Sequence, residues 1–205
     1  RSVVMVTRDG YVKRVSTEAF SNPRSTGIIA TSLEDGDELV GAELSDGGGC
    51  IVVGTRDGMT ICFKEDDARE MGRTARGVRA IELEGDDAVA GVTTMCGPES
   101  GGHLFTVTRD GYAKRMDLDE FDTQRRGGKG VIGADLKEGD GIASAFVADN
   151  HDYLLCFTNK GKAYWLKTYE VPEAGRTARG RSIVNLLDLE DDERVTETLP
   201  VDCFD

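Results

Sequence analysis

The chain has few of the residues that mark metal centres and membrane proteins. It holds only two histidines, His103 and His151, and one tryptophan among 205 residues. A histidine-rich metal site is therefore not expected. No apolar run reaches 18 residues, so the sequence predicts no transmembrane helix and no membrane partner. The first residues, RSVVMVTRDG, are too short and too polar for a signal peptide.

Cysteine usage and the lack of catalytic motifs further narrow the classes of protein to which this chain can belong. The five cysteines are odd in number and never spaced as CxxC, which predicts reduced and mostly buried thiols in the cytoplasm. They are Cys50, Cys62, Cys96, Cys156 and Cys203. No Walker, HExxH or Ser-His-Asp pattern occurs, so we expect no catalytic residue, no metal and no small-molecule substrate.

Lysine is scarce in a chain that is otherwise rich in charge. Eight lysines and 17 arginines stand against 22 aspartates and 16 glutamates, which gives a net charge of −13. Short carboxylates hold water and ions well, and high salt screens their mutual repulsion. This balance indicates a protein of a halophile, and an ordinary acidic domain is the alternative.

What the sequence does contain is a fourfold repeat. The tetrapeptide TRDG occurs at 7–10, 55–58 and 108–111, and TNKG occurs at 158–161; their glycines are 48, 53 and 50 residues apart. An apolar run precedes and follows each tetrapeptide, such as VVMV and YVKRV in the first repeat. This pattern predicts β-hairpins closed by two-residue turns, because Asp-Gly tolerates positive φ.

Each repeat continues in the same order. A second glycine follows 17 to 19 residues after the first, and after it come a third apolar run, an acidic turn and a fourth apolar run. The second glycines are Gly27, Gly77, Gly130 and Gly180, and the acidic turns lie at 34–37, 84–87, 138–140 and 190–193. The acidic turns lack the spacing of an EF-hand, so we interpret them as solvated connections between strands.

Four short strands in every repeat of about 50 residues predict an all-β, propeller-like array of four four-stranded antiparallel blades. The expected organisation is a single domain over 1–205, with repeats at approximately 1–48, 49–102, 103–151 and 152–205. Open sheet edges expose unpaired backbone groups. We therefore expect a closed ring, in which the segment near 195–204 lies beside the segment near 3–7.

The segments between the second and third strands are basic. They lie at 22–27, 73–79, 124–130 and 176–182, and they are called the basic loops below. Their 27 residues include 10 arginines or lysines and no acid. The third loop, QRRGGKG, combines three cations with three glycines. Four such loops at one structural position predict a positive rim on a negatively charged body.

The composition of the basic loops suits phosphate. Arginine presents a planar fork of donors that matches phosphate oxygens, and glycine lets backbone N–H groups approach an anion closely. The loops contain no aromatic residue on which unpaired bases could stack, which favours duplex DNA over single strands. The alternatives are solvated loops, or cations that pair with acidic neighbours.

The heptapeptide QRRGGKG resembles the gyrase-A box, the motif of the DNA gyrase A C-terminal domain. Its flanks agree, in VTRDGYAKRMDLDEFDTQRRGGKG and in DYLLCFTNKGKAYWLKTYEVPEAGRTARGRSIVNLL. The first two repeats, with MVTRDGYVKR and AREMGRTARGVRAIEL, resemble later blades of the same domain. The resemblance covers nearly the whole chain.

The resemblance implies a β-pinwheel, whose blades exchange strands and whose basic perimeter wraps duplex DNA in support of negative supercoiling. The domain itself would not be catalytic. ATP and Mg²⁺ would be used by other parts of a gyrase, and the partners would be double-stranded DNA, the breakage-reunion domain and gyrase B. Carried over residue by residue, the box is Gln124, Arg125, Arg126, Gly127, Gly128, Lys129 and Gly130. The perimeter cations would be Arg24, Arg73, Arg76, Arg79, Arg176, Arg179 and Arg181.

Two departures from the family pattern leave alternatives open. The family domain commonly has five or six blades and carries the box in the first, whereas this chain has four repeats with the box in the third. Within the class, the alternatives are the C-terminal domain of the gyrase-A counterpart in topoisomerase IV, whose box is generally degenerate, and a stand-alone or permuted paralogue. Outside it, the alternative is a protein-interaction propeller that grips an acidic partner.

Overall fold

The computed structural model describes residues 1–95, 102–190 and 192–201, and within them the chain is all-β, as predicted. The strands are β1 (Ser2–Thr7), β2 (Tyr11–Ser16), β3 (Leu39–Ser45), β4 (Cys50–Thr55), β5 (Met59–Lys64), β6 (Val78–Arg79), β7 (Val89–Met95), β8 (His103–Thr108), β9 (Tyr112–Asp117), β10 (Val131–Ile132), β11 (Ile142–Ala148), β12 (Tyr153–Thr158), β13 (Ala163–Lys167), β14 (Arg181–Ser182) and β15 (Val195–Val201). The short 3-10 helices are η1 (Thr17–Phe20), η2 (Glu65–Asp67), η4 (Leu118–Glu120), η5 (Thr168–Glu170) and η6 (Ile183–Asn185). No helix in these ranges is long and apolar enough to cross a membrane.

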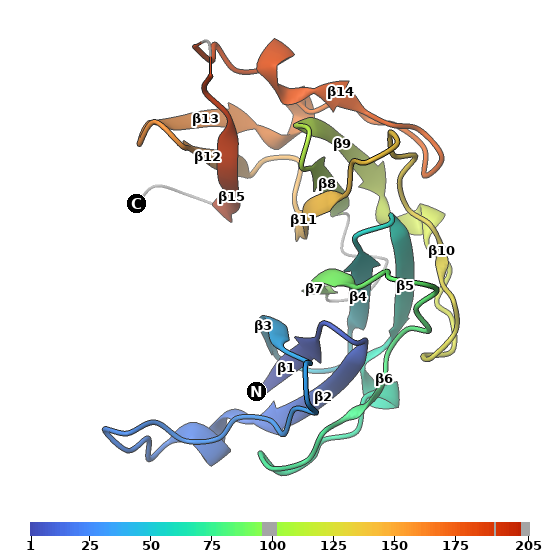
Figure 1. Ribbon diagram of the computed structural model, residues 1–205, viewed down its shortest axis with the longest axis vertical. Helices are drawn as coiled ribbons and strands as arrows, with labels where there is room; N and C mark the ends of the chain where they lie inside the picture. The colour runs from blue at the N-terminus through green and yellow to red at the C-terminus, as the bar shows by residue number, and fades with distance from the viewer. Residues whose placement is uncertain (96–101, 191, 202–205) are drawn as a thin grey trace.

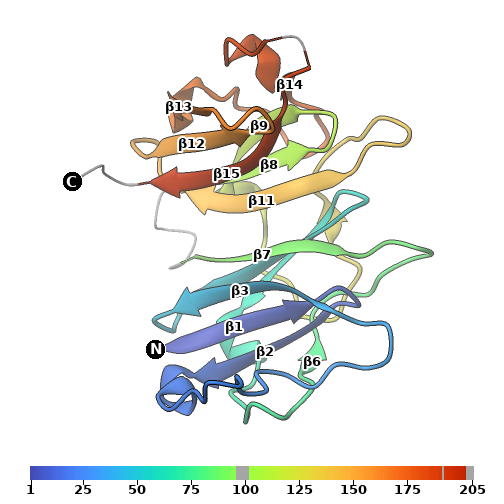
Figure 2. The ribbon, with the colours of Figure 1, turned by 60° about the vertical axis from the view of Figure 1, so that its left-hand side comes forward.

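The strands form four antiparallel sheets, here called blades 1 to 4, which follow one another along an open arc (Figure 1). Their strand orders are β3-β1-β2-β6, β10-β5-β4-β7, β11-β8-β9-β14 and β13-β12-β15. The strands β3, β7, β11 and β15 succeed one another along the inner side of the arc (Figure 2). The short strands β6, β10 and β14 lie on its outer side (Figure 1).

The expected closed ring is wrong. β15 pairs with β12 of its own blade, with Val201 opposite Tyr153, and not with the segment near 3–7. Blades 1 and 4 lie at opposite ends of the arc (Figure 1). The remainder of the expected closing segment, 202–204, lies outside the described residues. The sheets turn through too little of a circle to meet, because the angle between blades is set by their side-chain packing and not by the number of repeats.

The glycines of the TRDG-type turns close the hairpins, with one difference from the expected turn. All four have φ between 73° and 86°, and each donates its N–H to the carbonyl of the threonine three residues earlier, at 2.9–3.1 Å. The loop contains three residues and not two, and in the first three repeats the threonine hydroxyl accepts the N–H of the residue after the glycine. Tyr11 N–H donates to Thr7 Oγ1 at 3.3 Å, and Tyr112 makes the same bond in blade 3. The third loop residue is therefore a left-handed glycine.

The third strand of each repeat leaves its own blade and completes the preceding one. β6 of the second repeat pairs with β2, β10 of the third repeat with β5, and β14 of the fourth repeat with β9. The register is equivalent in the three pairs: Val78 opposite Val12, Val131 opposite Thr60, and Arg181 opposite Ala113. This exchange confirms the expected β-pinwheel, and it leaves blade 4 with three strands in the described part of the chain.

The hydrophobic cores lie between successive blades. Val4 of blade 1 shares a buried cluster with Ile51 of blade 2, and Phe105 of blade 3 shares one with Leu154 of blade 4. A middle blade is therefore buried on both faces, which explains why its strands are continuously apolar; all six residues of β4 are buried. The described cysteines are free and buried, as predicted, namely Cys50, Cys62 and Cys156. Cys96 and Cys203 lie outside the described residues.

The acidic turns have a structural task that the sequence interpretation missed. In each of the first three repeats, the last aspartate of the turn accepts the N–H of the TRDG aspartate at 3.0 Å. These pairs are Asp37 with Asp9, Asp87 with Asp57, and Asp140 with Asp110. In the fourth repeat, Glu193 accepts a hydrogen bond from the Thr158 hydroxyl at 2.7 Å. The acidic turns are therefore not simply solvated, because each one accepts a hydrogen bond from the TRDG-type hairpin turn of its own repeat.

Candidate nucleic-acid interface

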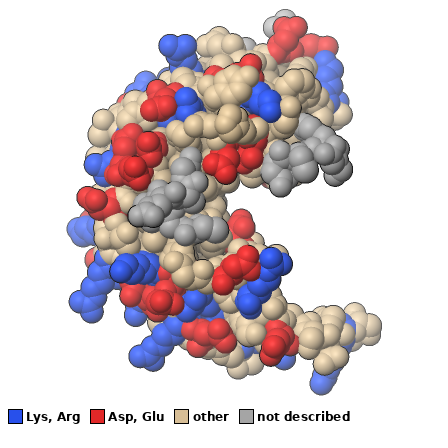
Figure 3. Space-filling model, turned by 180° about the vertical axis from the view of Figure 1, so that it is seen from behind, with Lys and Arg blue, Asp and Glu red and all other residues tan. Residues whose placement is uncertain are grey.

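The structure brings the basic loops of repeats two to four to the outer side of the arc, where each connects the second strand of its repeat to the exchanged third strand (Figure 1). The 22–27 loop of the first repeat extends instead from the end of the arc at blade 1 (Figure 1). Seen from behind, Lys and Arg side chains project along the outer margin, with Asp and Glu beside them (Figure 3). The loop at 124–130 belongs to the third repeat but ends on blade 2, because β10 pairs with β5. The rim is thus one surface built by successive repeats, and its charge is mixed.

Backbone hydrogen bonds hold the 124–130 loop against the second repeat. Gln124 N–H donates to the carbonyl of Cys62 at 2.7 Å, and Gly127 N–H donates to the carbonyl of Ala80 at 2.6 Å. Both acceptors belong to the repeat that the loop crosses. The loop therefore has a fixed path before any ligand is bound.

The glycines of this loop are required by the backbone around them. Gly127 and Gly130 have φ of +78° and +76°, a region that side chains with a Cβ rarely adopt. A Cβ on Gly130 would also lie 2.6 Å from the carbonyl oxygen of Thr60. The carbonyl of Gly128 accepts the N–H of Glu82 at 2.9 Å. The close approach of two repeats is thus sufficient to require glycine at position 130.

Two arginines of the loop differ in their surroundings. Arg126 Nε donates to the carbonyl of Asp67 at 2.7 Å, and its Nη1 donates to the carbonyl of Arg79 at 3.2 Å. Arg125 is exposed. A groove of about 630 Å³ opens beside them, lined by Asp66, Asp67, Arg69, Arg125, Arg126, Gly127 and Gly128. Arg126 therefore positions the loop through neutral acceptors, while Arg125 is free to reach an anion.

Lys129 forms an ion pair with Glu84 across the boundary between repeats. Both side chains are exposed, and their hydrogen bond raises the pKa of Lys129 and lowers the pKa of Glu84. A DNA phosphate that binds Lys129 must displace this carboxylate or share the ammonium with it.

The 73–79 loop is arranged around one aromatic ring. The Arg76 guanidinium stacks on Tyr11 at 3.7 Å from the ring centre and pairs with Glu34. Arg79 is exposed, and its Nη2 lies 3.4 Å from the Tyr11 hydroxyl oxygen. Tyr11 thus holds two cations side by side on the rim.

Arg73 makes the same kind of contact as Arg126, a hydrogen bond to a backbone carbonyl of the preceding repeat. Each stands four residues before the second glycine of its repeat. Arg73 Nη1 donates to the carbonyl of Ile29 at 2.9 Å, as Arg126 does to that of Arg79. Arg24, from the first repeat, is exposed and lines a shallow groove with Arg73.

The 176–182 loop carries the remaining candidate residues. Arg179 Nη2 lies 3.1 Å from Asp135 Oδ2. The Arg176 guanidinium lies 6.0 Å from the centre of the Phe121 ring. Arg181 is exposed on β14. Within the described part of the chain, three of the ten loop cations therefore pair with carboxylates, namely Arg76, Lys129 and Arg179. The interpretation as cations paired with acidic neighbours is correct for these three.

Two buried lysines fix the loops, and the sequence interpretation missed them. Lys114 Nζ donates to the carbonyls of Gly175, Arg176 and Ala178 at 2.8–3.0 Å. Burial lowers its pKa to about 8. Lys13 is equally buried and donates to carbonyls of the 73–79 loop in the same way. The sequence signal was a lysine at the same position of the second strand in repeats one and three, in YVKRV and YAKRM.

The comparisons with known proteins agree on one family. The family model described as DNA gyrase C-terminal domain, beta-propeller, matches residues 1–46, 51–94, 102–149 and 152–202. The DNA gyrase A protein of Haloquadratum walsbyi is 40% identical over 196 residues, which are 95% of this chain and 22% of that protein. The DNA gyrase A protein of Escherichia coli is 52% identical over 102 residues, which are 50% of this chain and 12% of that protein.

Solved structures show the same architecture. The C-terminal domain of DNA topoisomerase IV matches with a TM-score of 0.85 and 25% identity, over 98% of this chain and 61% of that one. A DNA gyrase A C-terminal domain matches with a TM-score of 0.81 and 20% identity, over 98% of this chain and 65% of that one. The chain spans about a fifth of the length of the curated relatives it matches.

Proposed function

Because the chain belongs to the DNA gyrase C-terminal domain family, the non-catalytic DNA-wrapping modules of type IIA topoisomerases, we propose that its basic loops bind duplex DNA and bend it around the outer side of the arc. The observation that carries this proposal is the placement of the loops. Cations from repeats two to four lie on one convex side, and the loop with the box motif is held by backbone bonds to the neighbouring repeat.

The loops suit a bent duplex in particular. Bending a site of 20–30 base pairs costs about 1–6 kcal/mol, and contacts along the path must offset it. Arg125 and Lys129 are exposed and stand on a loop whose path is already fixed, so gripping a phosphate orders little additional chain. The 124–130 loop would therefore anchor one part of the bent path, and the perimeter arginines would continue it.

We further propose that the domain works within the gyrase A protein of a complete gyrase in the cytoplasm. The complete QRRGGKG motif favours gyrase over topoisomerase IV. In that enzyme, the breakage-reunion domain and gyrase B would be its partners. ATP and Mg²⁺ would be used by those other parts, and this domain would need no cofactor of its own.

The test removes the two exposed cations of the 124–130 loop in the variant R125A/K129A. Arg126 is left in place because it braces the loop. With a doubly labelled duplex of about 40 base pairs, short against a persistence length of about 150 base pairs, we expect end-to-end energy transfer to fall towards the value of free DNA. The linking number captured on relaxed circles should fall with it. The magnitude of the salt slope of binding to a straight duplex should decrease by only about 1, because Lys129 is already paired with Glu84.

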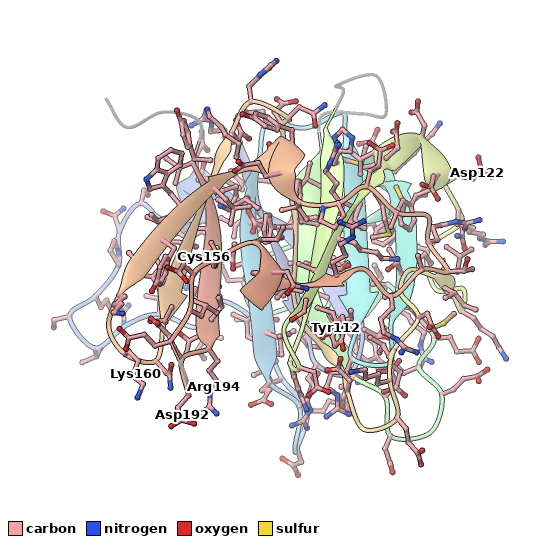
Figure 4. The ribbon with its side chains drawn as sticks, turned by 90° about the horizontal axis from the view of Figure 1, so that it is seen from above. Tyr112, Asp122, Cys156, Lys160, Asp192 and Arg194 are labelled. Carbon is pink, nitrogen blue, oxygen red and sulfur yellow. The ribbon has the colours of Figure 1, made fainter. Side chains whose placement is uncertain are left out.

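The matched control is K160A/R194A, which removes the same charge from exposed positions on blade 4. Seen from above, Lys160 and Arg194 lie on the opposite side of the molecule from Asp122, which stands just before the 124–130 loop (Figure 4). This control should bend DNA like the wild type. If R125A/K129A also bends DNA like the wild type, the loop is not the anchor.

A further inference from the structure

Blades 1 to 3 form a second groove, which lies where the inner strands β3, β7 and β11 begin, next to one another (Figure 2). The basic loops of repeats two to four lie on the outer side of the arc instead (Figure 1). The groove has a volume of about 390 Å³, and its polar lining consists of Arg8, Glu38, Arg56 and Arg109. The other lining residues are apolar. Three arginines from three repeats thus meet at a place that the DNA surface does not include.

The three arginines have equivalent positions, each being the second residue of a TRDG turn. Backbone hydrogen bonds set them in a row. Val89 N–H donates to the carbonyl of Arg8 at 2.9 Å, and the carbonyl just before Val89 accepts Arg56 N–H at 2.8 Å. Ile142 and the carbonyl before it join Arg56 to Arg109 in the same way, at 2.9 and 2.8 Å. The guanidinium groups therefore project from fixed backbone positions, so a ligand that binds them orders little additional chain.

A β-bulge lies beside each arginine. In blades 1 to 3, the register of the inner strand shifts where that strand begins, and the extra residue of each bulge lines the groove. These residues are Val40, Ala90 and Ala143. Bulges re-aim side chains and are over-represented next to active sites. In blade 4, the bulge adds the polar Thr196, and Asn159 stands where the other repeats have arginine. The combination of a guanidinium with an apolar bulge residue thus belongs to blades 1 to 3.

Two of the three guanidinium groups have no carboxylate partner in the described part of the chain. Arg8 pairs with Glu38 at 3.0 Å. Arg56 is held by the carbonyl of Asp86, and its Nε is buried without a hydrogen-bond partner among the described residues. Arg109 is exposed, and among those residues its side chain forms neither a hydrogen bond nor an ion pair. Placing two unpaired cations beside one groove is unfavourable, and an anion between them would remove this cost.

The geometry of two guanidinium groups favours a phosphate over a carboxylate. Each guanidinium presents a planar fork of N–H donors that can bind two oxygens at once. One fork is enough to fill the two oxygens of a carboxylate, whereas a phosphate group has three acceptor oxygens and can bind two forks together.

The surroundings of the groove favour a compact anion. Arg8 Nη2 donates to the carbonyl of Gly36 and Arg56 Nη2 to that of Asp86, so the acidic turns at 34–37 and 84–87 lie beside the arginines. A long polyanion such as duplex DNA would meet the carboxylates of these turns. A small anion can lie between Arg56 and Arg109 without reaching them.

We propose that this groove binds a compact phosphate-class anion, held between the guanidinium groups of Arg56 and Arg109. The apolar bulge residues keep water from part of the groove, which strengthens the charge-assisted hydrogen bonds. Arg8 lies at the end of the row and shares its charge with Glu38, the one carboxylate of the lining. The proposal concerns a site separate from the basic loops and does not depend on DNA bending.

Isothermal titration calorimetry with pyrophosphate in a low-salt buffer tests the proposal. In R109Q, a guanidinium is removed that makes no side-chain bond to the described residues, so the fold should be kept, which circular dichroism checks. Its affinity for pyrophosphate should fall at least about tenfold. R109K keeps the charge but loses the planar fork, so it should bind more weakly than the wild type and more tightly than R109Q. E38Q should bind pyrophosphate more tightly, because Arg8 is then free to share the anion.

Two control variants locate the anion. K160A/R194A removes two exposed cations near the TNKG turn of blade 4, where asparagine replaces the arginine, and it should bind pyrophosphate like the wild type. R125A/K129A tests the rim and should also bind it like the wild type. In the DNA assay, R109Q should bend the labelled duplex normally, so that failure of this site and failure of the proposed function can be distinguished.

A wild type that does not bind pyrophosphate would overturn the proposal. Unchanged affinity in R109Q would do so as well, and loss of binding in R125A/K129A would place the anion on the rim instead. Citrate, which offers carboxylates in place of phosphates, should bind more weakly than pyrophosphate; equal affinity would contradict the argument from the two guanidinium forks.

Discussion

Carboxylates that pair with the rim should make DNA binding less sensitive to salt than its ten loop cations suggest. Glu34, Glu84 and Asp135 pair with Arg76, Lys129 and Arg179. A phosphate that replaces one of these carboxylates gives up a condensed cation, but the displaced carboxylate takes up a cation from solution, so no net counterion is released. With all ten cations contributing, the slope of log K against log salt would be about −9; with seven, it would be about −6. We therefore predict that the wild type has the shallower slope.

The perturbation is the triple variant E34Q/E84Q/D135N, which keeps the size of the side chains and frees the three cations. Its slope should steepen to about −9, so that doubling the salt weakens binding about 500-fold, against about 60-fold for the wild type. In low salt it should bind duplex DNA more tightly. Fluorescence anisotropy over a series of KCl concentrations measures both quantities.

A matched variant, E18Q/D188N/D192N, removes the same charge from three exposed acids outside these pairs. It controls for the change in net charge, and its slope should stay close to that of the wild type. Equal slopes for the wild type and E34Q/E84Q/D135N would refute the reasoning, because the ion pairs would then not compete with phosphate. A control that steepens as much as the triple variant would assign the effect to overall charge.

Three further predictions concern stability. Gly130→Ala should lower the free energy of unfolding by about 3 kcal/mol, because it adds both left-handed strain and overpacking. Gly27→Ala has the same sign of φ but open space around the new Cβ, so it should lower the free energy of unfolding by about 1 kcal/mol. Equal losses for the two variants in urea unfolding would contradict the packing argument. The pKa of Lys114 is about 8 in the folded chain, below its ordinary value of about 10.4. Protonation therefore opposes folding, and the stability of the wild type relative to Lys114→Met should rise from pH 8 to pH 10; parallel urea midpoints would contradict it. Hydrogen bonds from the Thr158 hydroxyl, the backbone and Tyr164 lower the pKa of Glu193 to about 2. The stability that this carboxylate contributes above about pH 4.3 should therefore be lost as the pH falls towards 2. In Glu193→Gln, the midpoint temperature of thermal unfolding should depend less on pH over this acidic range.

The sequence predicted the local parts of this fold well, because glycine at positive φ is a local requirement. The four hairpins follow from the TRDG-type turns, and the position of the basic loops follows from the second glycines. The number of turn residues was wrong because the hydroxyl of Thr7 takes the N–H of Tyr11, a bond that composition does not indicate. Closure was wrong because the angle between blades is the sum of many side-chain contacts.

The candidate site was predictable in its residues but not in their roles. The heptapeptide QRRGGKG identifies a loop, and nothing in it separates Arg125, which is exposed, from Arg126, which braces the loop. That difference arises from carbonyls of the second repeat, some 50 residues earlier in the chain. Lys114 was missed for a related reason: its acceptors lie in the following repeat, so its burial becomes apparent only once the strands are exchanged.

The distinction between carbonyl and carboxylate partners accounts for how so acidic a chain can keep a basic rim. A cation that must be held in place needs an acceptor, and a carboxylate would hold it strongly but also neutralise it. Arg73 and Arg126 are held by carbonyls, so they are oriented without losing their charge. The buried ammonium groups of Lys13 and Lys114 donate to backbone carbonyls of the 73–79 and 176–182 loops. These bonds fix the loops and add positive charge beneath the rim. The carboxylates then act on cations at the outer margin, where salt and phosphate can exchange with them.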